Sequence, residues 1–221
     1  MKKILLISLL LGCLIPMSSF GQLSVLRDNG TGIPITANAF GGVKGSAYLE
    51  DFKKGILYLK TGQKVEGLYI ALNSYENSLE YKLEGGLFSY GPDKLVGFTY
   101  PSTSGELVEF TSEYEVPTLK QKRFVQVLEK GKYTLLFHPY KIMTDDPSAT
   151  YGAQASKVFQ EEQDFFVAVD GKVYLLRNKE KDLKEAFGAD LEKAIALIKS
   201  QKVNFKNKEE VWGFIQQLNK N

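Results

Sequence analysis

The chain has 221 residues, with 28 lysines and arginines against 26 aspartates and glutamates. Lys2 and Lys3 fall in a predicted leader, so the mature chain is expected to be electrically neutral. A neutral chain lacks the basic surface with which proteins bind nucleic acids and anionic membranes, and no nucleic-acid partner is expected.

Residues 1–21 have the three parts of a cleavable export signal. The basic start Met1-Lys2-Lys3 is followed by the apolar run Ile4–Leu11, which is shorter than the roughly 20 residues that span a bilayer. Ser19 and Gly21 are the small residues that signal peptidase recognises near the end of a leader. We therefore expect a signal peptide over 1–21 and a secreted protein of the bacterial cell envelope, in the periplasm, at the outer membrane or outside the cell.

Lipid anchoring is the alternative, because Leu10-Leu11-Gly12-Cys13 resembles a lipoprotein box. Cleavage before Cys13 would expose a cysteine for acylation, and the acyl chains would hold the protein at a membrane. Leu14–Met17, however, is apolar where lipoproteins usually begin a polar tether. We therefore prefer free export and expect membrane association only if Cys13 is lipidated.

Residues 22–44 are predicted to form a flexible lead-in, because Asn29–Gly32 and Gly41-Gly42 interrupt any regular pattern. Residues 45–177 are predicted to form an antiparallel β domain. Its short runs are rich in β-branched and aromatic residues and are separated by turn residues, which is typical of a β-meander.

The first strands of this domain alternate between apolar and polar positions. Leu79, Tyr81 and Leu83 are one apolar set, as in a strand with one solvated face. The predicted strands are 55–59, 65–72, 78–83, 87–90, 95–100 and 106–110.

Two similar hairpins follow, over residues 124–136 and 165–176. In the second, Asp170-Gly171 is typical of a type I′ turn, which needs positive φ at both central residues. Between the hairpins, Pro139–Gln163 is long, polar and rich in small residues. We expect a loop there, because a long segment of this kind in a compact domain is usually functional or disordered.

Residues 178–221 change to a helical pattern. Three side chains are predicted to cap helix N-termini: Asn178, Asp190 and, with Glu210 in a capping-box variant, Asn207. The first helix is predicted over 179–187. The apolar stripes of the next two are Leu191, Ala194, Ile195 and Ile198, and then Val211, Phe214, Ile215 and Leu218 with Trp212 at the margin.

Amphipathic helices of this length are marginal alone, so they are expected to dock on the sheet. The expected fold class is therefore α+β: an antiparallel β-meander sheet or partial barrel of roughly eight to ten strands, with short C-terminal helices packed on it.

Few side chains are available for catalysis. Cys13 is the only cysteine and leaves with the predicted leader, which excludes disulfides and thiolate chemistry from the mature chain. His138 is the only histidine, which rules out a zinc site with two or three histidines. No partner stands at a recognisable spacing, so His138 is expected to be structural or at the surface. We predict no catalytic, cofactor-binding or metal-ligating residue, and a protein that is not an enzyme.

Carboxylates are plentiful, so a glycosidase with two carboxylates is the competing class. The adjacent pairs Asp145-Asp146 and Glu161-Glu162 would point to opposite faces on a strand. Asp145–Ser148 lacks the ligand spacing of an EF-hand. Lys120–Arg123 is the densest basic cluster, and the neutral charge balance favours a solvated strand or turn there.

Tyrosines recur along the predicted strands and make the candidate contact surface, because they stack on sugar rings and are common at protein interfaces. Half-buried packing between strands is the alternative interpretation. The set is Tyr58, Tyr69, Tyr75, Tyr81, Tyr90, Tyr100, Tyr133 and Tyr174.

Residues 45 to about 100, which include Phe52–Gly55, Gly67–Ile70, Asn73-Ser74-Tyr75 and Leu79-Glu80-Tyr81, resemble a recurrent type of uncharacterised exported bacterial protein of unknown function. The hairpin and helices from Asp170 to Leu218 are similar to the tail of the same group. The resemblance implies an envelope location and supplies no catalytic residues. We expect a non-enzymatic binding or envelope-associated protein whose partner is an envelope protein or a glycan. A carboxylate-dependent glycan hydrolase and a lipid-anchored structural protein are the alternatives.

Overall fold

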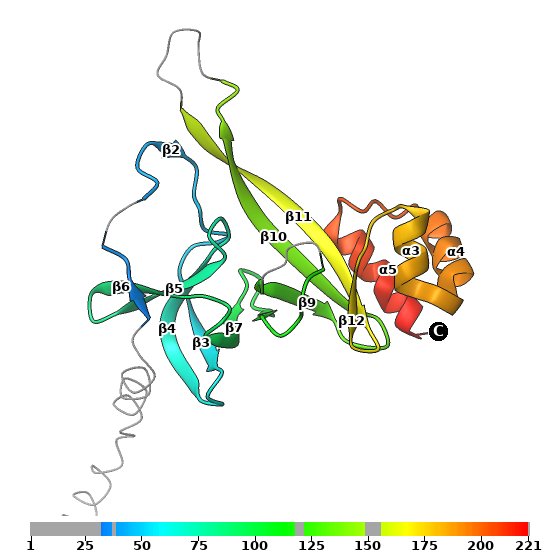
Figure 1. Ribbon diagram of the computed structural model, residues 1–221, viewed down its shortest axis with the longest axis horizontal. Coiled ribbons are helices and arrows are strands. Elements are labelled where there is room, and N and C mark those ends of the chain that lie inside the picture. Colours follow the sequence, from blue (N-terminus) through cyan, green and yellow to red (C-terminus); the bar gives the residue numbers. More distant parts are fainter. Residues whose placement is uncertain (1–31, 37–38, 118–121, 149–155, 221) are drawn as a thin grey trace, which may run out of the picture. The chain divides into compact units, whose positions relative to one another are not determined.

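The computed structural model describes residues 32–36, 39–117, 122–148 and 156–220 (Figure 1). The predicted signal peptide 1–21, Cys13 and most of the predicted lead-in lie outside the described residues. Within the described residues, none of the helices has the length and apolar character needed to cross a membrane.

The described residues form one open sheet of 12 strands. The strands from the first part of the chain are β3 (Lys53–Leu59), β4 (Lys64–Asn73), β5 (Ser78–Leu83), β6 (Gly86–Tyr90), β7 (Leu95–Pro101) and β8 (Leu107–Thr111). Those that follow are β9 (Val125–Glu129), β10 (Thr134–Asp145), β11 (Lys157–Val169) and β12 (Lys172–Leu175). Two short strands, β1 (Ile33–Pro34) and β2 (Val43–Lys44), complete the sheet.

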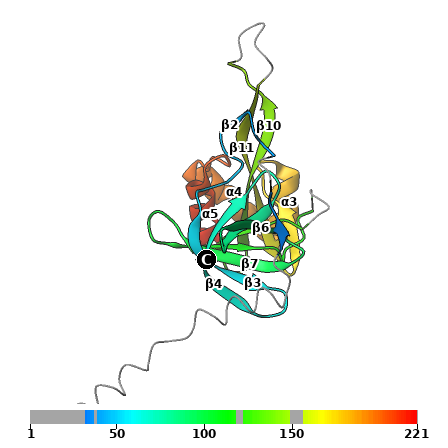
Figure 2. The same ribbon diagram turned by 90° about the vertical axis from the view of Figure 1, so that its left-hand side faces the viewer.

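The strand order departs from a continuous meander. It runs β1-β6-β5-β4-β3-β7-β8-β9-β10-β11-β12, and β2 pairs with β11 in parallel (Figure 2). β7 therefore lies beside β3 instead of β6, where Leu57 pairs with Phe98 and both side chains are buried. The prediction of a β-rich protein with C-terminal helices is confirmed. The sheet is open, however, and not a closed barrel.

The prediction of a loop over 139–163 is wrong for most of that segment, because β10 and β11 form a long hairpin there. Pairing runs without a break from Thr134 and Ala168 to Asp145 and Lys157. β9 pairs with β10 only as far as Phe137, so the rest of the hairpin extends past β9 (Figure 1). Most side chains of this outer part are only partly buried, and several are exposed, which fits its loop-like polarity. Pro139 is tolerated within β10 because β9 does not pair beyond Phe137, which leaves that side of the strand as an edge.

Three helices cover one face of β9–β12: α3 (Glu180–Phe187), α4 (Leu191–Gln201) and α5 (Lys208–Lys220), with a 3₁₀ turn, η1 (Gly188–Asp190), between the first two (Figure 1). Strand alternation sends Leu135 and Phe137 toward these helices, while Leu136 packs on the other face of the sheet. The predicted apolar face of α5 is confirmed, because all four of its stripe residues are buried.

The predicted helix caps have mixed outcomes. The Asn207 side-chain oxygen accepts hydrogen bonds from the backbone N–H groups of Glu209 and Glu210 at 3.0 and 3.2 Å, so that cap is confirmed. The other two are wrong. Lys179, not Asn178, precedes α3, and no side chain caps that helix. The carboxylate of Asp190 accepts a hydrogen bond from the hydroxyl of Tyr133 at 2.5 Å, which ties the helices to the sheet.

Glycine at position 97 is required by the close approach of β7 and β8. A Cβ atom there would lie 2.1 Å from the backbone oxygen of Phe110, a contact that only backbone movement can relieve. Gly97→Ala is therefore expected to lower the free energy of unfolding by about 1–3 kcal/mol, the usual cost of overpacking.

Urea unfolding of the two alanine variants Gly97→Ala and Gly213→Ala tests this. Gly213 lies in α5 with nothing within 4 Å of its added methyl group, so that variant should be neutral or slightly stabilised. Equal midpoints for both variants would contradict the tight β7–β8 contact.

Candidate functional site

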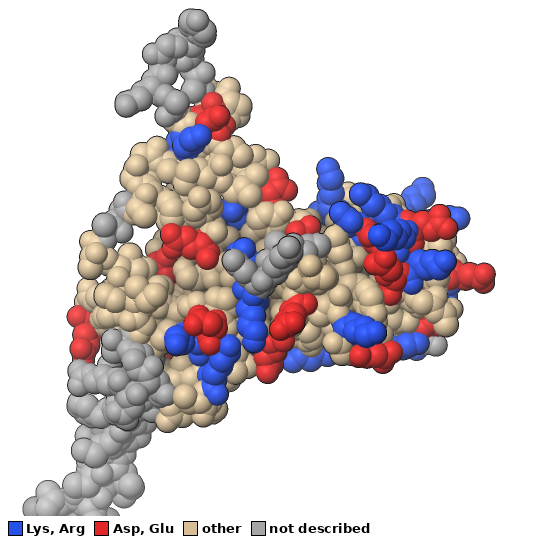
Figure 3. Space-filling view, viewed as in Figure 1, with Lys and Arg blue, Asp and Glu red and all other residues tan. Residues whose placement is uncertain are grey.

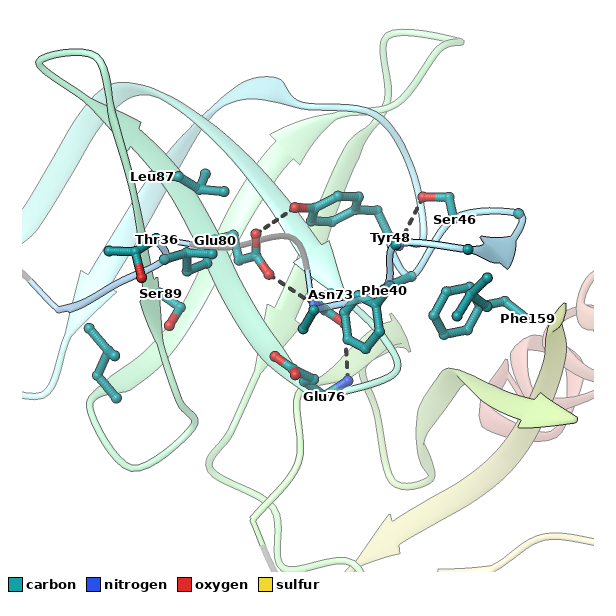
Figure 4. Close-up of a pocket in the computed structure, with 18 of the residues that line it drawn as sticks. Thr36, Phe40, Ser46, Tyr48, Asn73, Glu76, Glu80, Leu87, Ser89 and Phe159 are labelled. Atoms are coloured by element: carbon teal, nitrogen blue, oxygen red, sulfur yellow. Dashed lines mark hydrogen bonds between the residues drawn. The ribbon is translucent and has the colours of Figure 1, made fainter. Parts of the chain in front are cut away.

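A cavity of about 1000 Å³ lies between a covering segment, residues 33–36 and 39–48, and one face of β4, β5 and β6 (Figure 4). Its floor is formed by Glu80, Leu87 and Ser89 from the sheet. Asn73 and Glu76, from the end of β4 and the following turn, stand at one side. The covering segment supplies Ile33–Thr36, Ala39–Val43 and Gly45–Tyr48, and β11 supplies Phe159.

Alternation along β5 directs Glu80 into this cavity. Leu79 and Tyr81 point into the core and are fully buried, so the residue between them faces the opposite side. Glu80 pairs with Ala71 on β4 and with Ser89 on β6, and these two small side chains leave room above the sheet. The covering segment then buries Glu80, which is only 3% exposed.

Two neutral donors hold the Glu80 carboxylate. The Tyr48 hydroxyl donates to Oε2 at 2.6 Å, and the Asn73 amide donates to Oε1 at 2.9 Å. The Asn73 side-chain oxygen accepts a hydrogen bond from the backbone N–H of Glu76 at 3.0 Å, which fixes the amide (Figure 4). Burial and the hydrogen bond to Glu80 raise the pKa of Tyr48 well above its ordinary value, so its hydroxyl keeps the proton that it donates.

The backbone around Tyr48 is attached to the end of β4 and to β10. Tyr48 forms a β-bridge with Asn73, and Ser74 donates from its backbone to Ala47 at 3.0 Å. The Lys141 ammonium donates to the carbonyl oxygens of Ser46 and Tyr48 at 2.8 and 2.7 Å. The position of Tyr48 over Glu80 is therefore part of the fold and does not depend on a ligand.

Three aromatic rings from distant parts of the chain meet at one end of the cavity. Phe40, Tyr75 and Phe159 contact one another edge to face, with ring centroids 5.3 to 5.4 Å apart. Phe40 and Phe159 line the cavity, and Tyr75 extends the cluster to the surface. This end of the cavity is therefore aromatic and apolar, while the floor carries hydrogen-bonding groups.

The cavity is acidic. Glu76 and Glu80 are the two acidic residues of its lining, and the other lining residues in the described ranges are of neutral types. The surface over the C-terminal helices is different, because basic and acidic side chains are interspersed there on the face drawn in Figure 3.

No family model, curated protein or solved structure matches this chain. The resemblance to exported envelope proteins therefore stays a prediction, and function must be argued from the site.

His138 does not line this cavity. It lies within β10, 4% exposed, with its ring stacked on Tyr140 at 5.0 Å. Burial, with a smaller contribution from the charge of Arg123, lowers the pKa of His138 to about 4. Its Nδ1 atom is buried without a hydrogen-bond partner among the described groups. These features, and the position of the residue inside a strand, fit the predicted structural role.

The Asp145-Asp146 pair found in the sequence is occupied by lysines. Asp145 forms an ion pair with Lys157, and Asp146 forms one with Lys44 that holds the pKa of Asp146 well below its usual range. Asp146 also accepts hydrogen bonds from the backbone N–H and hydroxyl of Ser148 at 2.9 and 2.7 Å. In the described ranges, no three histidine, cysteine or acidic side chains are grouped as metal ligands.

The structure separates the predicted tyrosine surface into two sets. Tyr81, Tyr90, Tyr100 and Tyr133 are buried in the cores and Tyr174 is partly buried against one of them, whereas Tyr58, Tyr69 and Tyr75 are exposed. Sequence reasoning did not identify the cavity or its residues Tyr48 and Glu80. The alternation around Glu80 was the available signal, but it predicted solvent above that strand face.

Proposed function

We propose that this chain is an exported, non-enzymatic binding protein of the bacterial envelope and that it binds a glycan in the cavity above Glu80. One observation carries the proposal: a carboxylate is buried in the floor of an open, partly apolar cavity and is held in place by Tyr48 and Asn73. Pockets with a few fixed polar groups among apolar walls are typical of small-molecule sites.

The chemistry of the lining suits a hydroxylated ring. The Glu80 carboxylate and the Asn73 amide offer acceptors and donors for sugar hydroxyls, as do the hydroxyls of Ser46 and Ser89. The rings of Phe40 and Phe159 offer surfaces on which the apolar face of a sugar can stack. A volume of about 1000 Å³ has room for more than one sugar unit.

Binding is favoured over hydrolysis by the arrangement of the two carboxylates. A two-carboxylate glycosidase places them on either side of the scissile bond. Here Glu80 lies in the floor, where Tyr48 and Asn73 hold its carboxylate, and Glu76 stands at one side, bonded to Asn73 through its backbone N–H, so the two do not occupy opposite walls of the cavity (Figure 4). Hydrolysis remains the second candidate, since both carboxylates line the same cavity.

Calorimetric titration of the full chain with soluble envelope-type oligosaccharides tests the proposal. Glu80→Gln is expected to weaken binding at least tenfold, which corresponds to about 1.4 kcal/mol. Thr36→Trp should also weaken it, because a large side chain at this exposed lining position would fill part of the cavity. The control Glu185→Gln, on the exposed side of α3, should bind like the parent.

Two results would contradict this proposal. Binding that is unaffected by both cavity variants would place the glycan elsewhere. Release of reducing ends that is lost in Glu80→Gln and Glu76→Gln, while binding persists, would identify the hydrolase instead.

A further inference from the structure

We infer that the glycan bound above Glu80 carries a protonated primary amine, so that the ligand class is an amino sugar with free ammonium groups. This inference rests on the proposed function and names its substrate class. It comes from the charge of the cavity, the burial of Glu80 and the direction of the surrounding lysines.

A buried carboxylate is costly unless a cation or several hydrogen bonds compensate it. Each oxygen of Glu80 accepts one hydrogen bond, from Tyr48 or from Asn73, and both donors are neutral. These bonds orient the carboxylate but leave its charge in place. Glu76 adds a second negative charge at the same cavity.

The nearby lysines are engaged elsewhere. Lys44 pairs with Asp146. Lys141 donates to two backbone carbonyls, and its ammonium lies 3.4 Å from a carboxylate oxygen of Glu161. Lys82, on the same strand face as Glu80, stands over the ring of Phe52 with its ammonium 4.5 Å from the ring centroid. The protein therefore keeps its own cations out of the cavity and leaves the negative charge for a ligand.

An ammonium group on a sugar fits this site. It has three donors, and each carboxylate oxygen of Glu80 retains a lone pair beyond the one used by the protein. The faces of Phe40 and Phe159 also favour a cation, because aromatic rings attract positive charge. Acetylation of the amine removes the charge, and such a ligand would cover Glu80 without neutralising it.

A matched pair of ligands tests the inference: the tetramer of β-1,4-linked glucosamine and its fully N-acetylated form. The titrations are made with the full chain at about pH 6, where a primary amine is protonated. We expect the free-amine tetramer to bind at least tenfold more tightly than the acetylated one. Glu80→Gln should reduce that preference to within about twofold, a loss of about 1 kcal/mol or more. Glu185→Gln should keep it.

Tyr48→Phe is the second variant, because Glu80→Gln changes a buried hydrogen-bonded group and can fail to fold. It removes one neutral donor and leaves the charge of Glu80, so the preference for the amine should persist. Loss of the preference in Tyr48→Phe would overturn the inference.

The other outcomes separate the two proposals. Equal or tighter binding of the acetylated tetramer, still dependent on Glu80, overturns the amine inference and leaves glycan binding in place. Binding of neither tetramer overturns the amine inference, and glycan binding too if no other oligosaccharide binds. Glu185→Gln could also weaken the preference for the free-amine tetramer as much as Glu80→Gln does. In that case the preference reflects general surface charge, and the inference is overturned.

Discussion

Phe214→Ala is expected to lower the free energy of unfolding by about 3–5 kcal/mol, the usual cost of removing a buried phenylalanine side chain. Phe214 is 0% exposed in the core between α5 and the sheet. Its ring contacts Phe187 of α3 edge to face at 5.7 Å and that of Phe205 at 6.5 Å. The residue therefore joins two helices and the segment between α4 and α5, and alanine would leave a cavity among all three.

Urea denaturation followed by fluorescence and by circular dichroism measures this effect. The matched control is Phe214→Leu, which keeps most of the apolar volume and should cost clearly less than alanine. A loss below about 1 kcal/mol for the alanine variant would mean that the helices contribute little to stability, contrary to their packing on β9–β12. Separate transitions for helix and sheet signals would show that the two parts unfold independently.

Acidification from about pH 7.5 to about pH 5 is expected to lower stability by about 2 kcal/mol through His138. The imidazole titrates near its ordinary value in the unfolded chain, while burial and the charge of Arg123 lower its folded pKa to about 4. Between these two values the unfolded chain binds more protons than the folded one. Stability is therefore complete above the unfolded pKa and is lost as the pH falls toward the folded pKa.

His138→Phe isolates this contribution, because the chain has a single histidine. Denaturation midpoints are compared at several pH values for the parent and the variant. Asp164, which pairs with His138 across the hairpin, has a pKa raised mainly by burial and affects stability in the opposite direction. The difference between the two proteins removes this common term. Identical pH slopes for parent and variant would contradict a neutral, buried His138.

Local sequence patterns were sufficient for most strands and for one helix cap. The strand predicted over 78–83 has those same limits in β5, because its alternation depends only on neighbouring residues. Asp170 and Gly171 have φ angles of 50° and 75°, as the predicted type I′ turn requires. The Asn207 cap is equally local, since its donors lie within three residues.

Local sequence patterns did not predict which strands pair with one another. Strands with similar apolar patterns can pair in several orders, and the position of β7 beside β3 follows from packing between residues about 40 apart in sequence, such as Leu57 and Phe98. The β10–β11 hairpin was missed because most side chains of its outer half are only partly buried and polar residues are mixed among them, so the apolar alternation there is weak.

The candidate site, like the strand order, depends on contacts between distant segments and was not predictable from local patterns. Sequence alternation correctly separated Glu80 from the core residues Leu79 and Tyr81, but it implied a solvated face. Burial of Glu80 requires Tyr48, 32 residues earlier, to lie over the strand, and Lys141, 93 residues after Tyr48, to hold that segment. The pattern of side chains along one strand predicts on which face of the sheet each residue lies. It does not predict what covers that face, because the covering contacts form only when distant segments meet.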